Sequence, residues 1–199
     1  MQRNLIEGRA ALIVIDIQKS TFIDHSDNRA IPNMPGFKER MLETRKAVDA
    51  AHDAGVPVIF IQEIHRADGV DFGRELDGSE DVHCLDTDPG TPVAKKEMGY
   101  RAGDYIIPKR RYSAFFGTDF DILLRGLKAE TLLLTGALTD VCVHYTFVDA
   151  HQHDYFCRVI EDCVAGSTPE AHEASLNAME YLQTGARRSL AEVIAAMQA

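Results

Sequence analysis

The sequence has no long apolar run, no closely spaced cysteine pair and no excess of positive charge. A membrane span needs roughly 18 consecutive apolar residues, so we expect no membrane contact. The absence of a C-x-x-C pair excludes the common redox and zinc-finger spacings. A formal net charge of -10 argues against nucleic acid as the main partner.

The N-terminus, MQRNLIEGRA, also lacks the basic start and long apolar core of a signal peptide. We therefore expect a cytoplasmic protein whose four cysteines are reduced thiols. What is present fits a soluble globular chain, with 45% apolar and 26% charged residues. Without an internal repeat or a linker, residues 1–199 are expected to form a single domain.

Apolar, β-branched runs predict strands that are buried on both faces. Ala10–Ile17 reads AALIVIDI, with an Asp near its end, and Val56–Gln62 reads VPVIFIQ. Shorter runs of the same kind predict further strands at Tyr105–Pro108, Thr131–Thr135 and Phe156–Ile160.

Helical patterns alternate with these runs. Phe37–Ala54 carries a stripe of Phe37, Met41, Val48 and Ala51 and ends at Gly55. Further helices are expected near Asp119–Gly126, Asp140–His153 and Pro169–Thr184. Alternating strands and helices predict a three-layer α/β/α fold with a mostly parallel, Rossmann-like sheet. The ligand site of such a fold lies at the carboxyl ends of the strands.

One stretch, His65–Gly103, is rich in Gly, Asp and Pro and has little periodicity. A loop of this length inside a compact domain usually has a functional role. We therefore expect it to form part of the ligand site.

Three chemically capable residues follow three different predicted strands. Asp16 ends the first strand, Lys109 follows the third, and Cys142 follows the fourth in TGALTDVCVHY. Each residue alone also fits a structural role, as a hydrogen-bonded carboxylate, a solvated lysine or a small buried side chain. Gathered at one edge of a sheet, they make a complete nucleophilic set of base, cation and thiol.

Cys142 is expected in the first turn of a helix, where the helix dipole and unpaired N–H groups favour the thiolate. Cys157 and Cys163 lie in or near a strand and are interpreted as buried structural residues.

With these motifs the chain resembles the isochorismatase-like cysteine hydrolases, which include nicotinamidases, N-carbamoylsarcosine amidases, biuret hydrolases and ureidoacrylate hydrolases. Three segments, in the same order as in the family, are similar: ALIVIDIQKSTF, IIPKRRYSAFFGTDFDILLRGL and TLLLTGALTDVCVHYTFVDAHQHDY. The later VIEDCVAG also fits, and the similarity runs from about residue 10 to 185.

The resemblance implies the isochorismatase-like hydrolase fold and an amidohydrolase that cleaves a C–N bond through a thioester, with Asp16, Lys109 and Cys142 as catalytic residues. It also implies a cis peptide bond between Ala137 and Leu138 and an oxyanion hole made of the Leu138 and Cys142 N–H groups. The expected partner is a small polar amide or ureide that releases ammonia. Homo-oligomers, dimers or tetramers, are common in the family.

The resemblance leaves the metal question open. Family nicotinamidases bind a divalent metal through an Asp-x-His pair and a later His, and Glu63, His65 and His83 occupy comparable positions here. Because Glu63 replaces the Asp, we expect no metal and no cofactor, and interpret Glu63, His65 and Phe22 as substrate-binding residues. Arg66 and Arg74 are expected near the mouth of the site, where they would suit a carboxylate or a urea-type oxygen.

Three alternatives remain at this point: a vinyl ether hydrolase of the isochorismatase type, a metal-dependent nicotinamidase, and a non-catalytic protein that keeps the scaffold. Isochorismatases typically lack a cysteine at this position, so Cys142 argues against the first alternative. The complete Asp16, Lys109 and Cys142 set argues against the third.

Overall fold

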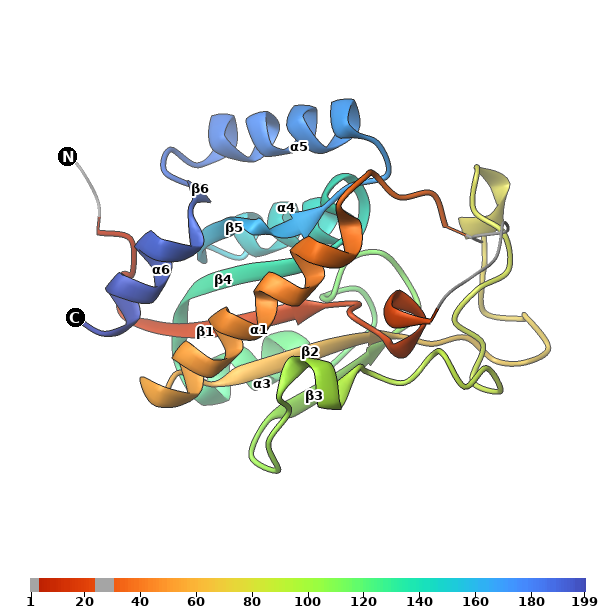
Figure 1. Ribbon diagram of the computed structural model, residues 1–199, viewed down its shortest axis with the longest axis horizontal. Helices are drawn as coiled ribbons and strands as arrows, with labels where there is room; N and C mark the ends of the chain where they lie inside the picture. The colour runs from red at the N-terminus through yellow and green to blue at the C-terminus, as the bar shows by residue number, and fades with distance from the viewer. Residues whose placement is uncertain (1–3, 24–30) are drawn as a thin grey trace.

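The computed structural model describes residues 4–23 and 31–199. A six-stranded sheet runs through the middle of the molecule in the order β3-β2-β1-β4-β5-β6 (Figure 1). All neighbouring strands pair in parallel. The strands span β1 (Arg9–Ile15), β2 (Val58–Glu63), β3 (Tyr105–Lys109), β4 (Ala129–Ala137), β5 (Phe156–Ala165) and β6 (Arg187–Arg188). The predicted α/β fold with a parallel sheet is therefore confirmed.

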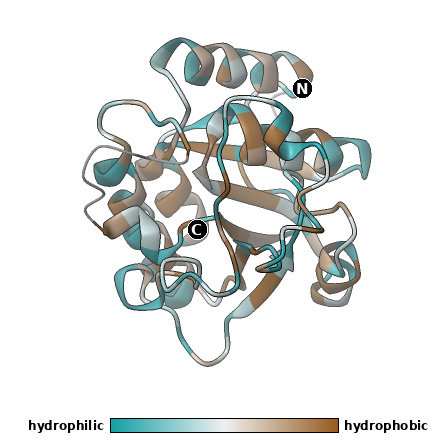
Figure 2. Cartoon of the chain, turned by 90° about the vertical axis from the view of Figure 1, so that its right-hand side faces the viewer, coloured by the Kyte–Doolittle hydropathy of each residue, from teal (hydrophilic) through white to brown (hydrophobic). Residues whose placement is uncertain are grey.

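Helices cover both faces of the sheet. On one face lie α1 (Phe37–Asp53), α2 (Lys95–Met98) and α6 (Leu190–Met197), whose buried side chains join one apolar cluster. On the other face lie α3 (Phe120–Leu127), α4 (His144–Gln152) and α5 (Pro169–Leu182), which join a second cluster. Figure 2 shows the hydrophobic strands in the middle and helices on either side. Among the described residues, none of the helices combines the length and apolar character needed to cross a membrane.

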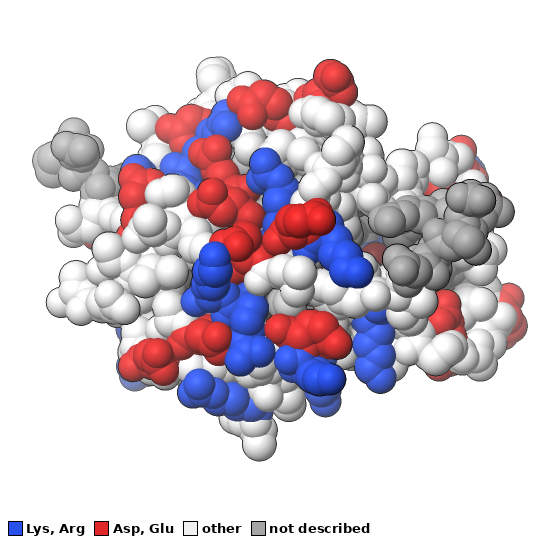
Figure 3. Space-filling view, viewed as in Figure 1, with Lys and Arg blue, Asp and Glu red and all other residues white. Residues whose placement is uncertain are grey.

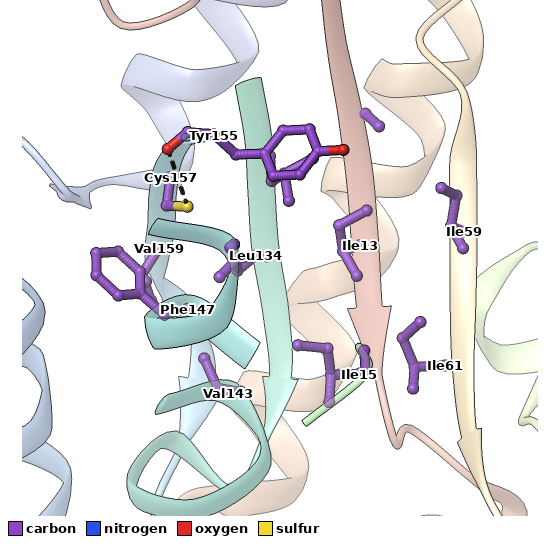
Figure 4. Close-up of a cluster of buried hydrophobic side chains, with 14 of the residues drawn as sticks. Ile13, Ile15, Ile59, Ile61, Leu134, Val143, Phe147, Tyr155, Cys157 and Val159 are labelled. Atoms are coloured by element: carbon purple, nitrogen blue, oxygen red, sulfur yellow. Dashed lines mark hydrogen bonds between the residues drawn. The ribbon is translucent and has the colours of Figure 1, made fainter. Parts of the chain in front are cut away.

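The middle of each central strand is a run of apolar residues because each strand has one face in each cluster. Ile13 and Ile15 point to the α3–α4–α5 side, whereas Leu12 and Val14 point to the α1 side. Figure 4 shows Ile13 and Ile15 between Leu134 of β4 and the isoleucines of β2. A sheet covered on both faces needs such continuous apolar runs, which is why the sequence shows them so clearly.

The outer surface of α1 is polar. Arg45 pairs with Asp49 at 2.9 Å, and Lys46 pairs with Glu43 at 2.7 Å. Figure 3 shows basic and acidic side chains interspersed over this face of the molecule. The predicted inner stripe is confirmed for Met41, Val48 and Ala51, which are fully buried, while Phe37 is half-buried.

The long loop 64–104 is held at the carboxyl end of the sheet by backbone pairing. The N–H of His65 donates to Cys84 O at 2.8 Å, and the N–H of Asp86 donates to His65 O at 2.7 Å. Gln18, just after β1, forms a bridge with Val93 of the same loop. These contacts hold the long loop against the carboxyl ends of β1 and β2, so it forms a fixed wall at this end of the sheet.

Candidate active site

Four strands deliver a functional side chain to one point at their carboxyl ends. Asp16 directly follows β1, Glu63 is the last residue of β2, and Lys109 is the last residue of β3. The register between β2 and β3 places Glu63 beside Lys109. Cys142 follows β4 after a short turn. The structure brings Asp16, Lys109 and Cys142 together at this edge of the sheet, where the sequence predicts them.

Lys109 lies at the centre of this group. Its Nζ is 2.9 Å from Asp16 Oδ2, 3.1 Å from Glu63 Oε2 and 3.4 Å from Cys142 Sγ. The side chain is fully buried, and burial alone would lower its pKa. The neighbouring Asp16, Cys142 and Glu63 outweigh burial and hold the pKa of Lys109 well above its ordinary value. Lys109 is therefore a fixed positive charge between two carboxylates and a thiol.

Asp16 is held in an uncommon backbone conformation with φ of 52°. Few non-glycine residues adopt this left-handed region, although Asp tolerates it better than most. Its Oδ1 accepts the Glu63 N–H at 3.0 Å, which ties the carboxylate to the adjacent strand. Burial raises the pKa of Asp16 to about 6, against the opposing effect of Lys109. A carboxyl with such a pKa can both accept and return a proton near neutral pH.

The turn that carries Cys142 depends on a glycine. Gly136 has φ of 106°, and a Cβ placed on it would clash with Ile15 O. Only glycine lets β4 pass this close to β1 at that point. The peptide bond between Ala137 and Leu138 is cis, as the resemblance predicts. A π-helical turn, Thr139–Val143, then leads into α4 and contains Cys142.

The expectation that its surroundings favour the Cys142 thiolate is wrong for the resting site. Burial raises the pKa of Cys142 well above its ordinary value, and Asp16 and Glu63 act in the same direction. Lys109 opposes them but is shared with both carboxylates. The thiol therefore keeps its proton at rest, and a thiolate can form only when a base accepts this proton.

Gln18 is a supporting residue that the sequence analysis did not single out. Its Oε1 accepts the Glu63 N–H at 3.0 Å, and its Nε2 donates to Thr91 O at 2.6 Å. Gln18 thus connects the ends of β1 and β2 to the long loop. The sequence contains one signal for this role, since Gln18 lies two residues after Asp16.

A pocket of about 310 Å³ opens onto these groups. Its walls come from the ends of the strands, the segment before α1, the long loop and the turn that carries the cysteine. The residues nearest to the chemistry are Asp16, Gln18, Glu63, His83, Cys84, Tyr112, Leu138, Val141 and Cys142. The volume suits a small ligand.

Four residues that were expected at the pocket lie elsewhere. Phe22 is outside the lining and packs against the apolar cluster under α1. His65 is fully buried beside Glu63. Arg66 pairs with Asp71 at 3.0 Å and remains largely exposed.

Arg74 does not reach the pocket either, because its side chain is 92% exposed and pairs with Asp77. The sequence placed both arginines in the correct loop but could not show which way each side chain points.

A second polar cluster lies beside the first and shares Glu63 with it. Glu63, His65, Glu75 and His83 are all buried, and one ligand atom from each lies within 4.8 Å of the others. His65 Nε2 is 3.3 Å from Glu63 Oε1 and 3.6 Å from Glu75 Oε2. His83 Nε2 is 3.5 Å from Glu63 Oε1 and 4.0 Å from Glu75 Oε1. Two imidazoles and two carboxylates form a donor set that fits a divalent cation.

Within the described residues, several polar atoms of this cluster are buried and make no hydrogen bond. Among the described residues, both carboxyl oxygens of Glu75 and the Nε2 of His83 are buried without a hydrogen-bond partner. Burial raises the pKa of Glu75 to about 8, and Glu63 adds to this effect. Burial would raise the pKa of Glu63 as well, but Lys109 and the two histidines bring it well below its ordinary value. The sequence missed Glu75 because it lies in a loop without periodicity.

Comparison with known proteins gives a consistent result. Residues 10–195 match the isochorismatase domain family. Ureidoacrylate amidohydrolase RutB of Yersinia enterocolitica is 32% identical over 194 residues, which cover 86% of this chain and 82% of the relative.

Two solved structures share the fold as well as sequence. The pyrazinamidase/nicotinamidase of Streptococcus mutans has a TM-score of 0.78 and 28% identity, covering 90% of this chain and 99% of that chain. N-carbamoylsarcosine amidase of Thermoplasma acidophilum has a TM-score of 0.70 and 26% identity, covering 92% of this chain and 95% of that chain.

Proposed function

This chain belongs to the isochorismatase family and is an amidohydrolase, and we propose from this that Asp16, Lys109 and Cys142 cleave the C–N bond of a small ureido compound or amide. The observation that carries the proposal is the position of Lys109 Nζ, within 3.4 Å of all its partners, Asp16, Glu63 and the Cys142 thiol. The proposed base Asp16, the fixed cation Lys109 and the nucleophile Cys142 therefore lie together, and Asp16 and Cys142 line the pocket.

In the first half of the proposed reaction, Asp16 accepts the proton of the Cys142 thiol and becomes a neutral acid. The thiolate, stabilised by Lys109, attacks the carbonyl carbon and forms a C–S bond. The N–H groups of Leu138 and Cys142 are the proposed donors to the oxyanion that develops on the carbonyl oxygen. Asp16 then returns its proton to the leaving nitrogen as the C–N bond breaks, and ammonia or an amine departs.

In the second half, water replaces the departed amine. Asp16, again a carboxylate, takes one proton from this water while the oxygen of the water attacks the thioester carbon. The C–S bond breaks, the acid product forms, and Cys142 recovers its proton from Asp16. Asp16 thus acts as base and as acid in turn, for which a pKa of about 6 is well placed.

The described part of the pocket suits a small polar substrate. Its volume is about 310 Å³, and its acidic lining includes Asp16, Glu63 and Glu80. Urea-type N–H groups can donate to such carboxylates. The relative from Yersinia enterocolitica is a ureidoacrylate amidohydrolase, which supports a ureido group as the part that reacts. We therefore place ureides ahead of aromatic amides.

An ammonia-release assay over a panel of ureides and amides tests this proposal. The panel contains biuret, N-carbamoyl amino acids, ureidoacrylate and nicotinamide, with isochorismate as a non-amide control. We expect at least one ureide to be hydrolysed with a kcat/KM at least about tenfold above that for nicotinamide. Ammonia from no member of the panel, together with pyruvate from isochorismate, would favour the vinyl ether alternative.

Three further expectations from the sequence remain proposals: a cytoplasmic location, a homo-oligomeric state and a single domain over residues 1–199. In support of subunit contacts, the apolar side chains of Phe116 and Ile122 are 65% and 74% exposed. A small-molecule substrate is the partner that an amidohydrolase requires.

A further inference from the structure

We propose that Ser167 and His172, which lie outside the pocket, are positioning residues for the turn Thr139–Val143 and so for the N–H groups that receive the oxyanion. Ser167 holds Asp140 of this turn, and His172 holds Thr139. We call these two contacts the turn bridges. The inference rests on the proposed thioester chemistry and adds to it two residues that do not line the pocket.

The turn that carries Cys142 is an uncommon backbone structure. Thr139–Val143 is a single π-helical turn between β4 and α4, and such turns are rare and occur frequently at functional sites. Leu138 O accepts the N–H groups of both Val141 and Val143, at 3.1 Å each. The two proposed oxyanion donors, the N–H groups of Leu138 and Cys142, belong to this turn and to the residue before it. Their direction therefore follows the shape of the turn.

Sheet topology places the end of β5 beside this turn. The register pairs Ala137, at the end of β4, with Ala165, at the end of β5. The segments that follow the two strands therefore leave the sheet side by side. After Ala165 the chain passes through Gly166 and Ser167 and enters α5, whose N-cap is Thr168. One strand end and the helix after it thus supply both turn bridges.

The first turn bridge joins Ser167 to Asp140 by two hydrogen bonds. The Ser167 N–H donates to Asp140 Oδ1 at 2.8 Å, and the Ser167 hydroxyl donates to Asp140 Oδ2. Space around this bridge is tight, since a Cβ placed on Gly166 would clash with Asp140 Oδ1 and with His172. Both oxygens of Asp140 are thus held from one side, two residues before Cys142.

The second turn bridge joins His172 to Thr139. His172 Nδ1 lies 2.8 Å from Thr139 Oγ1, and both side chains are buried. Burial lowers the pKa of His172, and nearby Arg40 acts in the same direction, so the imidazole is neutral near pH 7. The His172 N–H donates to Thr168 O at 3.0 Å, which ties the residue to the first turn of α5. A hydrogen bond between two buried side chains is costly to leave unmade, so this bridge holds Thr139 in place.

Loss of a turn bridge has a specific consequence for the reaction. The N–H groups of Leu138 and Cys142 must point at the oxyanion, and a misplacement of about 1 Å can lower a rate by about 10²-fold. Substrate binding depends on pocket walls that neither Ser167 nor His172 forms. We therefore expect kcat for the best ureide to fall while KM stays within about threefold.

Two reactions of the Cys142 thiol test this role, because only one of them forms an oxyanion. The ester p-nitrophenyl acetate acylates the thiol through a tetrahedral intermediate, forming the C–S bond and expelling p-nitrophenolate. Iodoacetamide alkylates the same thiol by displacing iodide from a saturated carbon. Both rates are measured on the whole chain, and the rate of Cys142→Ala is subtracted from each.

The variants Ser167→Ala and Thr139→Val each remove the side-chain hydrogen bond of one turn bridge with little change in volume. Each is expected to slow acylation at least about tenfold and to change alkylation by less than about threefold. Thr139→Ser, which keeps the hydroxyl, should restore the wild-type acylation rate. The matched control is Ser175→Ala, since Ser175 is buried in α5 but makes no side-chain hydrogen bond among the described residues. Its acylation rate should match that of wild type.

Two results would each overturn the inference. One is a loss of acylation below about tenfold in either bridge variant. The other is an equal loss of acylation and alkylation, which indicates a general disturbance of the thiol. Ammonia release by wild type separates this inference from the proposed function. Acylation of Cys142 without ammonia from any ureide or amide would contradict only the proposed function, whereas ammonia release with undiminished acylation in both variants would contradict only the role of the turn bridges.

Discussion

Replacing Cys142 with alanine is expected to reduce ammonia release by about 10⁵–10⁶-fold, because the variant has no atom that can form the thioester. Asp16 would still line the pocket and pair with Lys109, but no nucleophile would remain for these two residues to activate. The side chain is small and lies at the rim of a cavity, so the fold should survive the change. Turnover of the best ureide is measured in wild type and variant, with thermal unfolding as the check on folding.

The matched control is Cys84→Ala. Cys84 lines the same pocket, and its Sγ accepts a hydrogen bond from Gln18 at 3.5 Å. Burial raises the pKa of Cys84 well above its ordinary value, and its Sγ contacts Gln18, whereas that of Cys142 contacts Lys109. This variant should retain at least about a tenth of the wild-type rate. Similar losses in both variants would remove the special role assigned to Cys142.

Asp16→Asn is expected to lower kcat/KM by about 10²–10⁴-fold, the usual contribution of general acid–base catalysis. The amide keeps the size of the carboxyl but cannot accept the Cys142 proton. In wild type, kcat/KM should fall about tenfold per pH unit below about pH 6, since burial raises the pKa of Asp16 to about 6 and only its carboxylate is a base. The residual activity of Asp16→Asn should lack this inflection.

The measurement is a pH–rate profile from pH 4.5 to 8, recorded for wild type, Asp16→Asn and the control Asp88→Asn. Asp88 is an exposed carboxylate that lines the same pocket. Its loss changes the charge by the same amount without touching Lys109. An acid limb that persists in Asp16→Asn would show that another group, and not Asp16, titrates.

The fold could be predicted from the sequence where burial on both faces forces a continuous apolar run. This is why β1, β2 and the core of β4 lie where expected. The ends of the strands do not follow from the apolar runs: β5 continues five residues beyond Ile160, to Ala165. The run that follows Ile160 includes Glu161 and Asp162, whose charges hide the strand. The pairing of β5 with β4 is also interrupted there by a register shift, between Leu134 and Gly136 of β4.

Two elements near the C-terminus were missed. β6 consists of Arg187 and Arg188 alone, and two arginines carry no strand signal. For α6 a signal was present. Ser189 caps the helix, and Glu192 completes a capping box with it. The pattern S-x-x-E before an apolar run would have placed this helix.

The site was predictable for residues attached to strand ends and not for those attached to the loop. Asp16 and Lys109 sit at positions that sheet topology alone brings together. Glu75 is different, because its place beside Glu63 depends on how a 3₁₀ turn, Glu75–Asp77, folds back within the long loop. Arg74, its neighbour in sequence, points into solvent instead. No periodic pattern distinguishes the two.

The most direct test of the central claim is the mass of the protein when it is acid-quenched during turnover of its best ureide. We predict a covalent adduct equal to the acyl part of the substrate, mapped by peptide analysis to Cys142 and accompanied by one ammonia or amine per acyl group. The adduct should be absent in Cys142→Ala and should disappear once the substrate is consumed. Undiminished ammonia release by Cys142→Ala, or an adduct mapped to another cysteine, would contradict the account.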